Sequence, residues 1–253
     1  MRTCSLLSWN VQRAEMCKPE QTREAILSLL QLVQPGVLLL QEYSHNIKSL
    51  CKSAYLSLGY IQASKLLASR QNIELEILIN ENVFEVVDVQ YISYSDIKHT
   101  VSPHGALIVT LIPHAIGEQF RVITTHLTAK QDWRARKIQL ERIFRLYDND
   151  KVIIAGDFNT ITIQDTKVLR TLGEQYPAYQ EATHNINRTY YPQRIDNIRF
   201  NNRIIRFLGS LIYLTGYARK LDRIFVRGIG SDQCITCDPQ RSDHVALLAE
   251  LIL

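Results

Sequence analysis

Val152-Ile-Ile-Ala-Gly-Asp-Phe-Asn159 (VIIAGDFN) joins a short apolar run to a polar tetrapeptide. The run from Val152 to Ala155 is rich in β-branched residues and predicts a buried strand, which ends at Gly156-Asp157. Earlier in the chain, Arg121 to Thr125 predicts a strand that ends at His126, and an amphipathic helix is expected between the two strands. Strands that alternate with helices in this way are typical of an α/β fold.

Similar patterns continue on both sides of this segment and predict a mixed sheet with antiparallel strands. The expected strands are Ser5–Trp9, Val37–Leu40, Glu74–Ile79, Val83–Tyr91, Ala106–Ile112, Ile224–Val226 and Val245–Leu251. A helix is expected from about Pro19 to Leu32, and Pro35-Gly36 ends it. The polar stretch from His184 to Arg206 predicts a long surface excursion.

The helix expected from Asp132 to Leu146 has an apolar and a basic side. Its apolar residues predict an inward face made of Trp133, Ile138, Ile143 and Leu146. Its basic residues predict a solvated face, for which contact with a phosphate backbone is a second possible role. These residues are Arg134, Arg136, Lys137, Arg142 and Arg145.

Length and composition favour a single domain over residues 1–253. The chain has 253 residues, 46% of them hydrophobic, which is enough for one or two layers of core. Its net charge of +4 permits a polyanionic partner without requiring one. The N-terminus lacks the pattern of a signal peptide, and no apolar run is long enough to span a membrane, so we expect a cytoplasmic or nuclear monomer.

The five cysteines do not form the pattern of a disulfide framework. Their number is odd, and they are scattered along a chain that is long enough to build a core without cross-links. This usage favours a reducing compartment. Cys234-Ile-Thr-Cys237 has the spacing of a zinc or redox half-site, but no second pair accompanies it, and we interpret it as two unrelated thiols in a loop.

Polar side chains recur where the apolar runs end or begin. Each has an ordinary explanation by itself, for example Asn10 as a turn cap, His126 as a histidine at a sheet edge or Asp157 in an Asx turn. Their occurrence at six runs outweighs these explanations, because open α/β sheets bind ligands at strand ends. The residues concerned are Asn10, Glu42, His126, Asp157, Asn159, Asp222, Asp243 and His244.

This set contains the groups that hydrolysis of a phosphate ester needs. Mg²⁺ takes oxygen ligands and is commonly bound by one or two carboxylates, which Glu42 and Asp243 supply. A carboxylate such as Asp157 suits the deprotonation or positioning of a water, and Asp222 suits the orientation of a histidine. Amide and imidazole donors stabilise the charge that develops on phosphate oxygens. The candidate donors are Asn159, His126 and His244.

Six short motifs occur in an order that resembles the endonuclease/exonuclease/phosphatase family, whose fold is DNase I-like. They are Ser8–Gln12 (SWNVQ), Leu39–Glu42 (LLQE), Thr125–Leu127 (THL), Gly156–Asn159 (GDFN), Leu221–Phe225 (LDRIF) and Ser242–His244 (SDH). The resemblance covers the chain from Ser8 to its end. It implies a two-sheet, four-layer α/β sandwich with helices on the outer faces and a catalytic site at one end of the sheets.

The resemblance also implies the metal ligands. Glu42 is the principal ligand, with Asn10 and Asp243 beside it, and Asn10 is also a substrate contact. The implied metal is Mg²⁺, for which Mn²⁺ can substitute.

The catalytic groups are implied in the same way. Asp157 positions or deprotonates the attacking water, and His244 pairs with Asp222 to stabilise the transition state. Asp196 has neighbours similar to those of Asp222 and competes for that role. The implied phosphate contacts are Asn159 and His126.

Several segments are most similar to the tyrosyl-DNA phosphodiesterase branch of the family. These are Ile123–Leu127, Ala135–Leu140, Ala218–Arg227 and the ending Ser242–Leu253. His126 stands where abasic-site endonucleases of the family have tyrosine. Two departures concern phosphate contacts, because His104 and Ile161 each stand where relatives have arginine. His104 is therefore a candidate substrate contact or simply a surface residue.

Tyr190 and Tyr191, between Arg188 and Arg194, are two adjacent aromatic residues in the polar excursion. As candidate substrate contacts they would stack on a nucleobase or a phenol. The alternative is a turn with partly buried tyrosines.

The sequence therefore predicts a Mg²⁺-dependent hydrolase of a phosphodiester in or attached to nucleic acid, with release of a 5′-linked adduct as the specific version. The second alternative is a phosphatase of inositol or other lipid phosphates, which would use the same cluster with different residues around it. A non-catalytic binding module is the third alternative, and the presence of every expected catalytic position argues against it.

Overall fold

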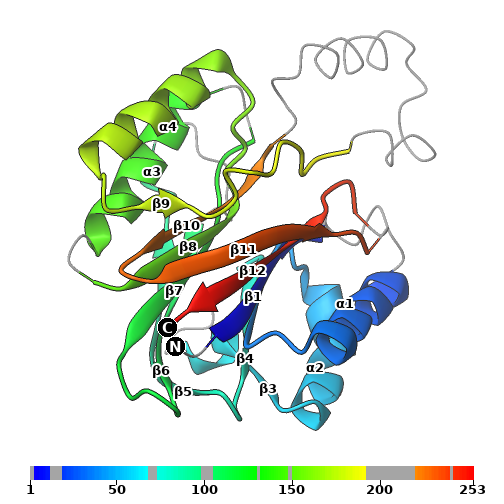
Figure 1. Cartoon of the computed structure of the whole chain (residues 1–253). Helices are drawn as coiled ribbons and strands as arrows, with labels where there is room; N and C mark the ends of the chain where they lie inside the picture. The colour runs from blue at the N-terminus through cyan, green and yellow to red at the C-terminus, as the bar shows by residue number, and fades with distance from the viewer. Residues whose placement is uncertain are drawn as a thin grey trace, which may run out of the picture.

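Two six-stranded β-sheets lie face to face, and each carries a pair of helices on its outer side (Figure 1). The computed structural model describes residues 3–11, 19–67, 73–97, 105–129, 132–147, 150–191, 220–239 and 242–253. The four layers confirm the expected α/β sandwich.

The first sheet has the strand order β11-β12-β1-β2-β4-β3. Its strands are β1 (Thr3–Asn10), β2 (Val37–Gln41), β3 (Tyr60–Gln62), β4 (Leu75–Asn80), β11 (Gly230–Cys237) and β12 (Ala246–Ile252). β1 and β2 are parallel, and the other neighbours are antiparallel. Helices α1 (Pro19–Val33) and α2 (His45–Ser57) pack on its outer face, and a 3₁₀ turn, η1 (Ala63–Leu66), follows β3.

The second sheet has the strand order β5-β6-β7-β8-β10-β9. Its strands are β5 (Phe84–Ser93), β6 (Gly105–Pro113), β7 (Phe120–His126), β8 (Val152–Asp157), β9 (Gln180–Glu181) and β10 (Asp222–Arg227). β7 and β8 are parallel, while the remaining pairs are antiparallel. Helices α3 (Trp133–Leu146) and α4 (Ile163–Gln175) cover its outer face.

The central strands read as continuous apolar runs because both of their faces are covered. In β8, Ile153 and Ala155 pack between the two sheets, whereas Ile154 points to the layer of α3 and α4. Burial of one such aliphatic side chain stabilises the fold by about 1.5–3 kcal/mol. Gln41 joins the sheets near the strand ends, since its Nε2 donates to Thr124 Oγ1 at 2.9 Å.

All strands expected from the sequence are present within one or two residues of their expected bounds, and so is the first helix. The sequence patterns did not predict α2, α4, β3, β9 or β11. The polar excursion is described only as far as residue 191, so Asp196 and Arg194 lie outside the described residues.

The expected inward face of α3 is wrong in part. Ile143 is buried, but Ile138 and Leu146 are 47% and 41% exposed. The helix instead buries the face that contains Arg136 and Gln139, because both polar side chains find buried hydrogen-bond partners. The assignment of Arg136 to a solvated face is therefore also wrong.

Cys234 and Cys237 lie on strand β11 and not in a loop, which corrects that part of their interpretation. Cys234 is buried, Cys237 is partly buried, and both are free thiols, as are Cys4 and Cys51. Cys17 lies outside the described residues. Among the helices of the described part of the chain, none is long and apolar enough to span a membrane.

Candidate active site

Six strand ends from the two sheets meet at one edge of the sandwich. β1, β2, β7 and β8 end there, because they form two parallel pairs. β10 and β12 begin there, because each runs antiparallel to its neighbour in those pairs. The polar residues at or next to these strand ends are Asn10, Glu42, His126, Asp157, Asp222 and His244.

Asn10 connects the carboxylates of the two sheets. Its Nδ2 donates to Glu42 Oε1 at 3.2 Å and to Asp157 Oδ2 at 2.9 Å. Asn10 and Asp157 are buried, while the side chain of Glu42 is 22% exposed. Glu42 is thus the member of this trio that reaches the surface.

His126 and Asp157 lie side by side because they are register partners at the ends of the parallel strands β7 and β8. His126 Nε2 is 3.6 Å from Asp157 Oδ2 and 3.8 Å from Glu42 Oε1. An imidazole at this place therefore faces two carboxylates.

Asp222 and His244 form a buried pair. Asp222 opens β10 directly opposite Asp157, and its Oδ2 is 2.7 Å from His244 Nδ1. His244 Nε2 consequently points toward Asp157 Oδ2, at 3.9 Å. Burial lowers the pKa of His244, but Asp222, Asp157 and Asp243 together outweigh burial and raise this pKa to about 10. The surrounding carboxylates thus favour the protonated form of this imidazole.

Asp243 is a buried carboxyl on the other side of His244. Burial raises its pKa, the neighbouring His244 lowers it, and Glu42, Asp157 and Asp222 raise it again, to about 6. Four carboxyl groups thus influence one another within this site, an arrangement that a bound cation would stabilise.

Two residues of the site have backbone angles that favour glycine. Glu42 has φ 54° and Asn159 has φ 47°. Such conformations of residues other than glycine cost about 1–3 kcal/mol and are concentrated at functional sites. Asn159 is fixed there by two hydrogen bonds, from its backbone N to Asp157 Oδ1 at 2.8 Å and from its Nδ2 to Leu127 O at 2.9 Å.

Tyr190 joins the site through a short antiparallel bridge to His244. The two rings are 5.1 Å apart at 59°, and burial, with Asp243 and Asp157, raises the pKa of the phenol. Tyr191 meets the site through its backbone, whose N donates to Asp243 O at 2.6 Å. Its ring packs instead against Arg188, whose Cζ is 4.0 Å from the ring centroid.

The structure thus brings together those residues proposed from the sequence that it describes, Tyr191 through its backbone only. His104 and Asp196 lie outside the described residues.

Three supporting residues were missed in the sequence. Thr189 Oγ1 accepts hydrogen bonds from the backbone N of Leu221 and of Asp222, at 3.0 Å each. Ser242 Oγ donates to Asn10 O, and Trp9 Nε1 donates to His244 O. Ser242 and Trp9 lie inside the quoted motifs, so the motifs were a usable signal for them, whereas Thr189 had none.

Two groups of possible metal ligands occur within the part of the chain that the structure describes. In each, the ligand atoms lie within 4.8 Å of one another: Glu42 with His126 and Asp157, and Asp157 with Asp222 and His244. In the second group, Nδ1 of His244 is already bound to Asp222 Oδ2 at 2.7 Å. The first group offers carboxylate oxygens, which suit a hard cation such as Mg²⁺. Asp243 belongs to neither group.

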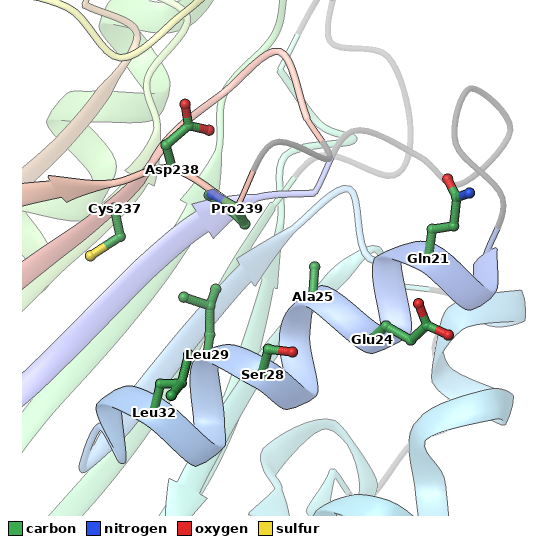
Figure 2. A pocket seen from close by; sticks show the side chains of 9 residues that line it. All are labelled: Gln21, Glu24, Ala25, Ser28, Leu29, Leu32, Cys237, Asp238 and Pro239. Carbon is green, nitrogen blue, oxygen red and sulfur yellow. The ribbon is translucent and has the colours of Figure 1, made fainter.

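A surface groove of ≈ 410 Å³ lies elsewhere, between α1 and the end of β11 (Figure 2). Leu29 and Leu32 line it together with Cys237 and Pro239. The groove shares no residue with the strand-end cluster, so the candidate active site is defined by the cluster and not by this groove.

The chain belongs to the endonuclease/exonuclease/phosphatase family. The model of this family matches residues 7–244, which include Asn10, Glu42, Asp157 and the Asp222–His244 pair. The fold and the family are those of phosphodiesterase- and nuclease-type hydrolases.

Among individual proteins, the chain is 23% identical to tyrosyl-DNA phosphodiesterase 2 of Mus musculus, over 98% of this chain. The chain spans 66% of the length of that relative. A crystal structure of D. rerio TDP2 complexed with single-strand DNA product is similar over 100% of both chains, with a TM-score of 0.76 and 18% identity. The human Nocturnin catalytic domain with bound sulfate is similar over 98% of this chain and 93% of its own, with a TM-score of 0.69 and 18% identity.

Proposed function

We propose that this protein is a divalent-metal-dependent phosphodiesterase that acts on a phosphodiester in or attached to nucleic acid, within a single catalytic domain. The observation that carries the proposal is the convergence of Glu42, His126 and Asp157 with the Asp222–His244 pair at one edge of the two sheets.

The metal site is proposed to contain Glu42 as principal ligand, with Asn10 and Asp243 beside it. The fit rests on the donor chemistry, since these residues offer hard oxygen ligands and no thiol is among them. When bound, Mg²⁺ or Mn²⁺ would screen the phosphate oxygens and polarise the phosphorus centre.

The residues of this chain supply the proton chemistry. Asp157 takes the proton of the attacking water, whose oxygen bonds to phosphorus while the bond from phosphorus to the ester oxygen breaks. The protonated His244, oriented by Asp222, stabilises the negative charge that grows on the phosphorus oxygens. His126 and Asn159 contact the phosphate from the ends of β7 and β8.

The proposed substrate is a 5′-tyrosyl-DNA end. The resemblance in sequence and the name of the Mus musculus relative favour this reading, and the DNA product in the D. rerio structure supports a nucleic acid substrate. In this chain, the ring of Tyr190 lies against His244, where it would stack on a nucleobase or on the phenol of the adduct.

Parallel hydrolysis assays test this proposal. A 5′-tyrosyl oligonucleotide, the same oligonucleotide without tyrosine, and a phosphoinositide would each be incubated with the protein and Mg²⁺. We expect cleavage of the tyrosyl oligonucleotide, and a kcat that is lower by about two to four orders of magnitude for Asp157→Asn. Cleavage of the phosphoinositide alone would instead support a lipid phosphatase.

Tyr190 gives a second test of the substrate. Loss of one stacking contact costs about 1–3 kcal/mol, so Tyr190→Ala should raise KM for the oligonucleotide by at least about fivefold, while Tyr190→Phe keeps the ring and should bind almost normally. Equal KM values for the two variants would show that the ring of Tyr190 does not stack on the substrate.

A further inference from the structure

Three buried side chains outside the candidate site connect the loops that carry its catalytic residues. Arg136 and Gln139 come from α3, and Asp165 comes from the first turn of α4. All three are at most 2% exposed. None of them belongs to the strand-end cluster, and the proposed chemistry does not use them.

The first loop follows β7 and begins directly after His126. Both backbone groups of Thr128 are bound by α3, because its N donates to Gln139 Oε1 at 3.2 Å and its O accepts from Arg136 Nη1 at 3.0 Å. The position of this loop is therefore set by two side chains of one helix.

The second loop follows β8 and leads from Asn159 into α4. Asp165 Oδ2 accepts from the backbone N of Ile161 at 3.1 Å, and from both the backbone N and Oγ1 of Thr162 at 2.7 Å. Thr162 and Asp165 also form the capping box of α4. One carboxylate thus fixes the start of the helix and the loop before it.

The two loops are joined by a bidentate ion pair. Arg136 Nε lies 2.8 Å from Asp165 Oδ1, and Arg136 Nη2 lies 2.8 Å from Asp165 Oδ2. Two parallel hydrogen bonds fix both distance and orientation. Burial of two charges gives little net stability compared with apolar residues of similar size, so stability alone is a weak reason for this pair.

The same loops also touch at the site itself. Leu127 N donates to Asp157 O at 2.9 Å, and Asn159 Nδ2 donates to Leu127 O at 2.9 Å. A displacement of either loop would therefore move His126 relative to Asp157 and Asn159.

We propose that Arg136, acting with Asp165 and Gln139, is a positioning residue that fixes His126 and Asn159 relative to each other. This inference rests on the proposed function for its catalytic consequence. Loss of such support typically costs about 10- to 100-fold in activity.

Arg136→Met and Asp165→Asn test the proposal, with Arg142→Met as the matched control. Arg142 lies on the same helix and makes a bidentate pair too, to Asp96 at 2.9 and 2.6 Å, but it contacts neither loop. We expect kcat for the tyrosyl oligonucleotide to fall about 10- to 100-fold in the first two variants and to stay unchanged in the control.

Two readouts separate positioning from a merely structural role. Amide hydrogen exchange, measured well below the melting temperature, should rise in peptides that cover 127–129 and 160–163 and not in the control. In addition, Arg136→Met should cost little more when His126 is already alanine, because both changes act through one unit. Unchanged exchange in these peptides would overturn the inference. So would a double variant whose loss in kcat equals the product of the losses in the two single variants.

Gln139→Met keeps the test decisive if removal of one partner of the ion pair prevents folding. It deletes the acceptor of Thr128 N and leaves both partners of the ion pair in place, so exchange should rise at 127–129 and kcat should fall. A folded Gln139→Met protein with unchanged exchange and kcat would overturn the inference. If the wild type cleaves no phosphodiester, the proposed function fails, and the exchange data alone decide whether these side chains fix the loops.

Discussion

His244 has a charge state that depends strongly on its neighbours. Its Nδ1 is bound by Asp222 at 2.7 Å, and its pKa of about 10 lies well above the ordinary value of 6.5. A raised folded-state pKa means that the contribution of the pair to stability is fully present below pH 6.5 and is lost as the pH rises through about 10.

A histidine titration followed by NMR in the metal-free protein tests this charge state. His244 should keep its proton through pH 8. Asp222→Asn should lower the pKa of His244, because it removes a carboxylate that offsets the effect of burial. A wild-type His244 that titrates near pH 6.5 would show that Asp222 does not hold the imidazole as a cation.

The same pair makes a kinetic prediction. Asp222→Ala and His244→Ala should each lower kcat strongly, and the double variant should cost little more than one of them, because the carboxylate acts through the imidazole. Asp196→Ala should be nearly silent. Coupling of Asp196 with His244, together with an independent effect of Asp222, would assign the orienting role to Asp196 instead.

The contact between strands β7 and β8 places His126 next to Asp157. Gly156 lies opposite Thr125 in this parallel pair, with φ +147°, and a Cβ there would be 2.0 Å from Thr125 O. This contact is with the backbone of β7, so a side-chain movement cannot relieve it. The GDFN motif therefore needs its glycine for close approach of the two strands.

Gly156→Ala should destabilise the protein by about 1–3 kcal/mol or more and abolish activity, because the strands must separate at the site. Gly173→Ala, in α4, is the control, for which we expect a change in stability of opposite sign. No atom lies within 4 Å of a Cβ there, and alanine should stabilise the helix by about 0.5–1 kcal/mol. Urea unfolding measures both, and equal stability of the two variants would contradict the packing account.

Helices were harder to predict than strands for a physical reason. The sheets lie between other layers, so their strands have long apolar runs. Among the side chains of α2 that the structure describes, the buried ones are Ile47, Cys51 and Tyr55, and α4 buries Asp165 with two aliphatic residues. The i, i+4 spacing in α2 and the capping box of α4 were the signals that could have predicted these helices.

In the molecule as a whole, the proximity of the candidate residues was predictable because most of them are strand-end residues in recognisable motifs. Order along the chain does not show which face of α3 is buried, however. Arginine is usually a surface residue. Arg136 is buried here because the packing of α3 against α4 brings its partner Asp165 close. Such supports depend on tertiary contacts between segments that no local pattern connects.

If the strand-end cluster is a metal-dependent phosphoesterase site, as we propose, its activity must depend on Mg²⁺ and on Glu42. The most direct measurement is the hydrolysis rate of the tyrosyl oligonucleotide against Mg²⁺ concentration, for the wild type and for Glu42→Gln. The wild type should be inactive in EDTA and should recover on addition of Mg²⁺, whereas Glu42→Gln should need at least about tenfold more Mg²⁺ for half-maximal rate. Full turnover in EDTA, or the same Mg²⁺ requirement in both proteins, would contradict the account.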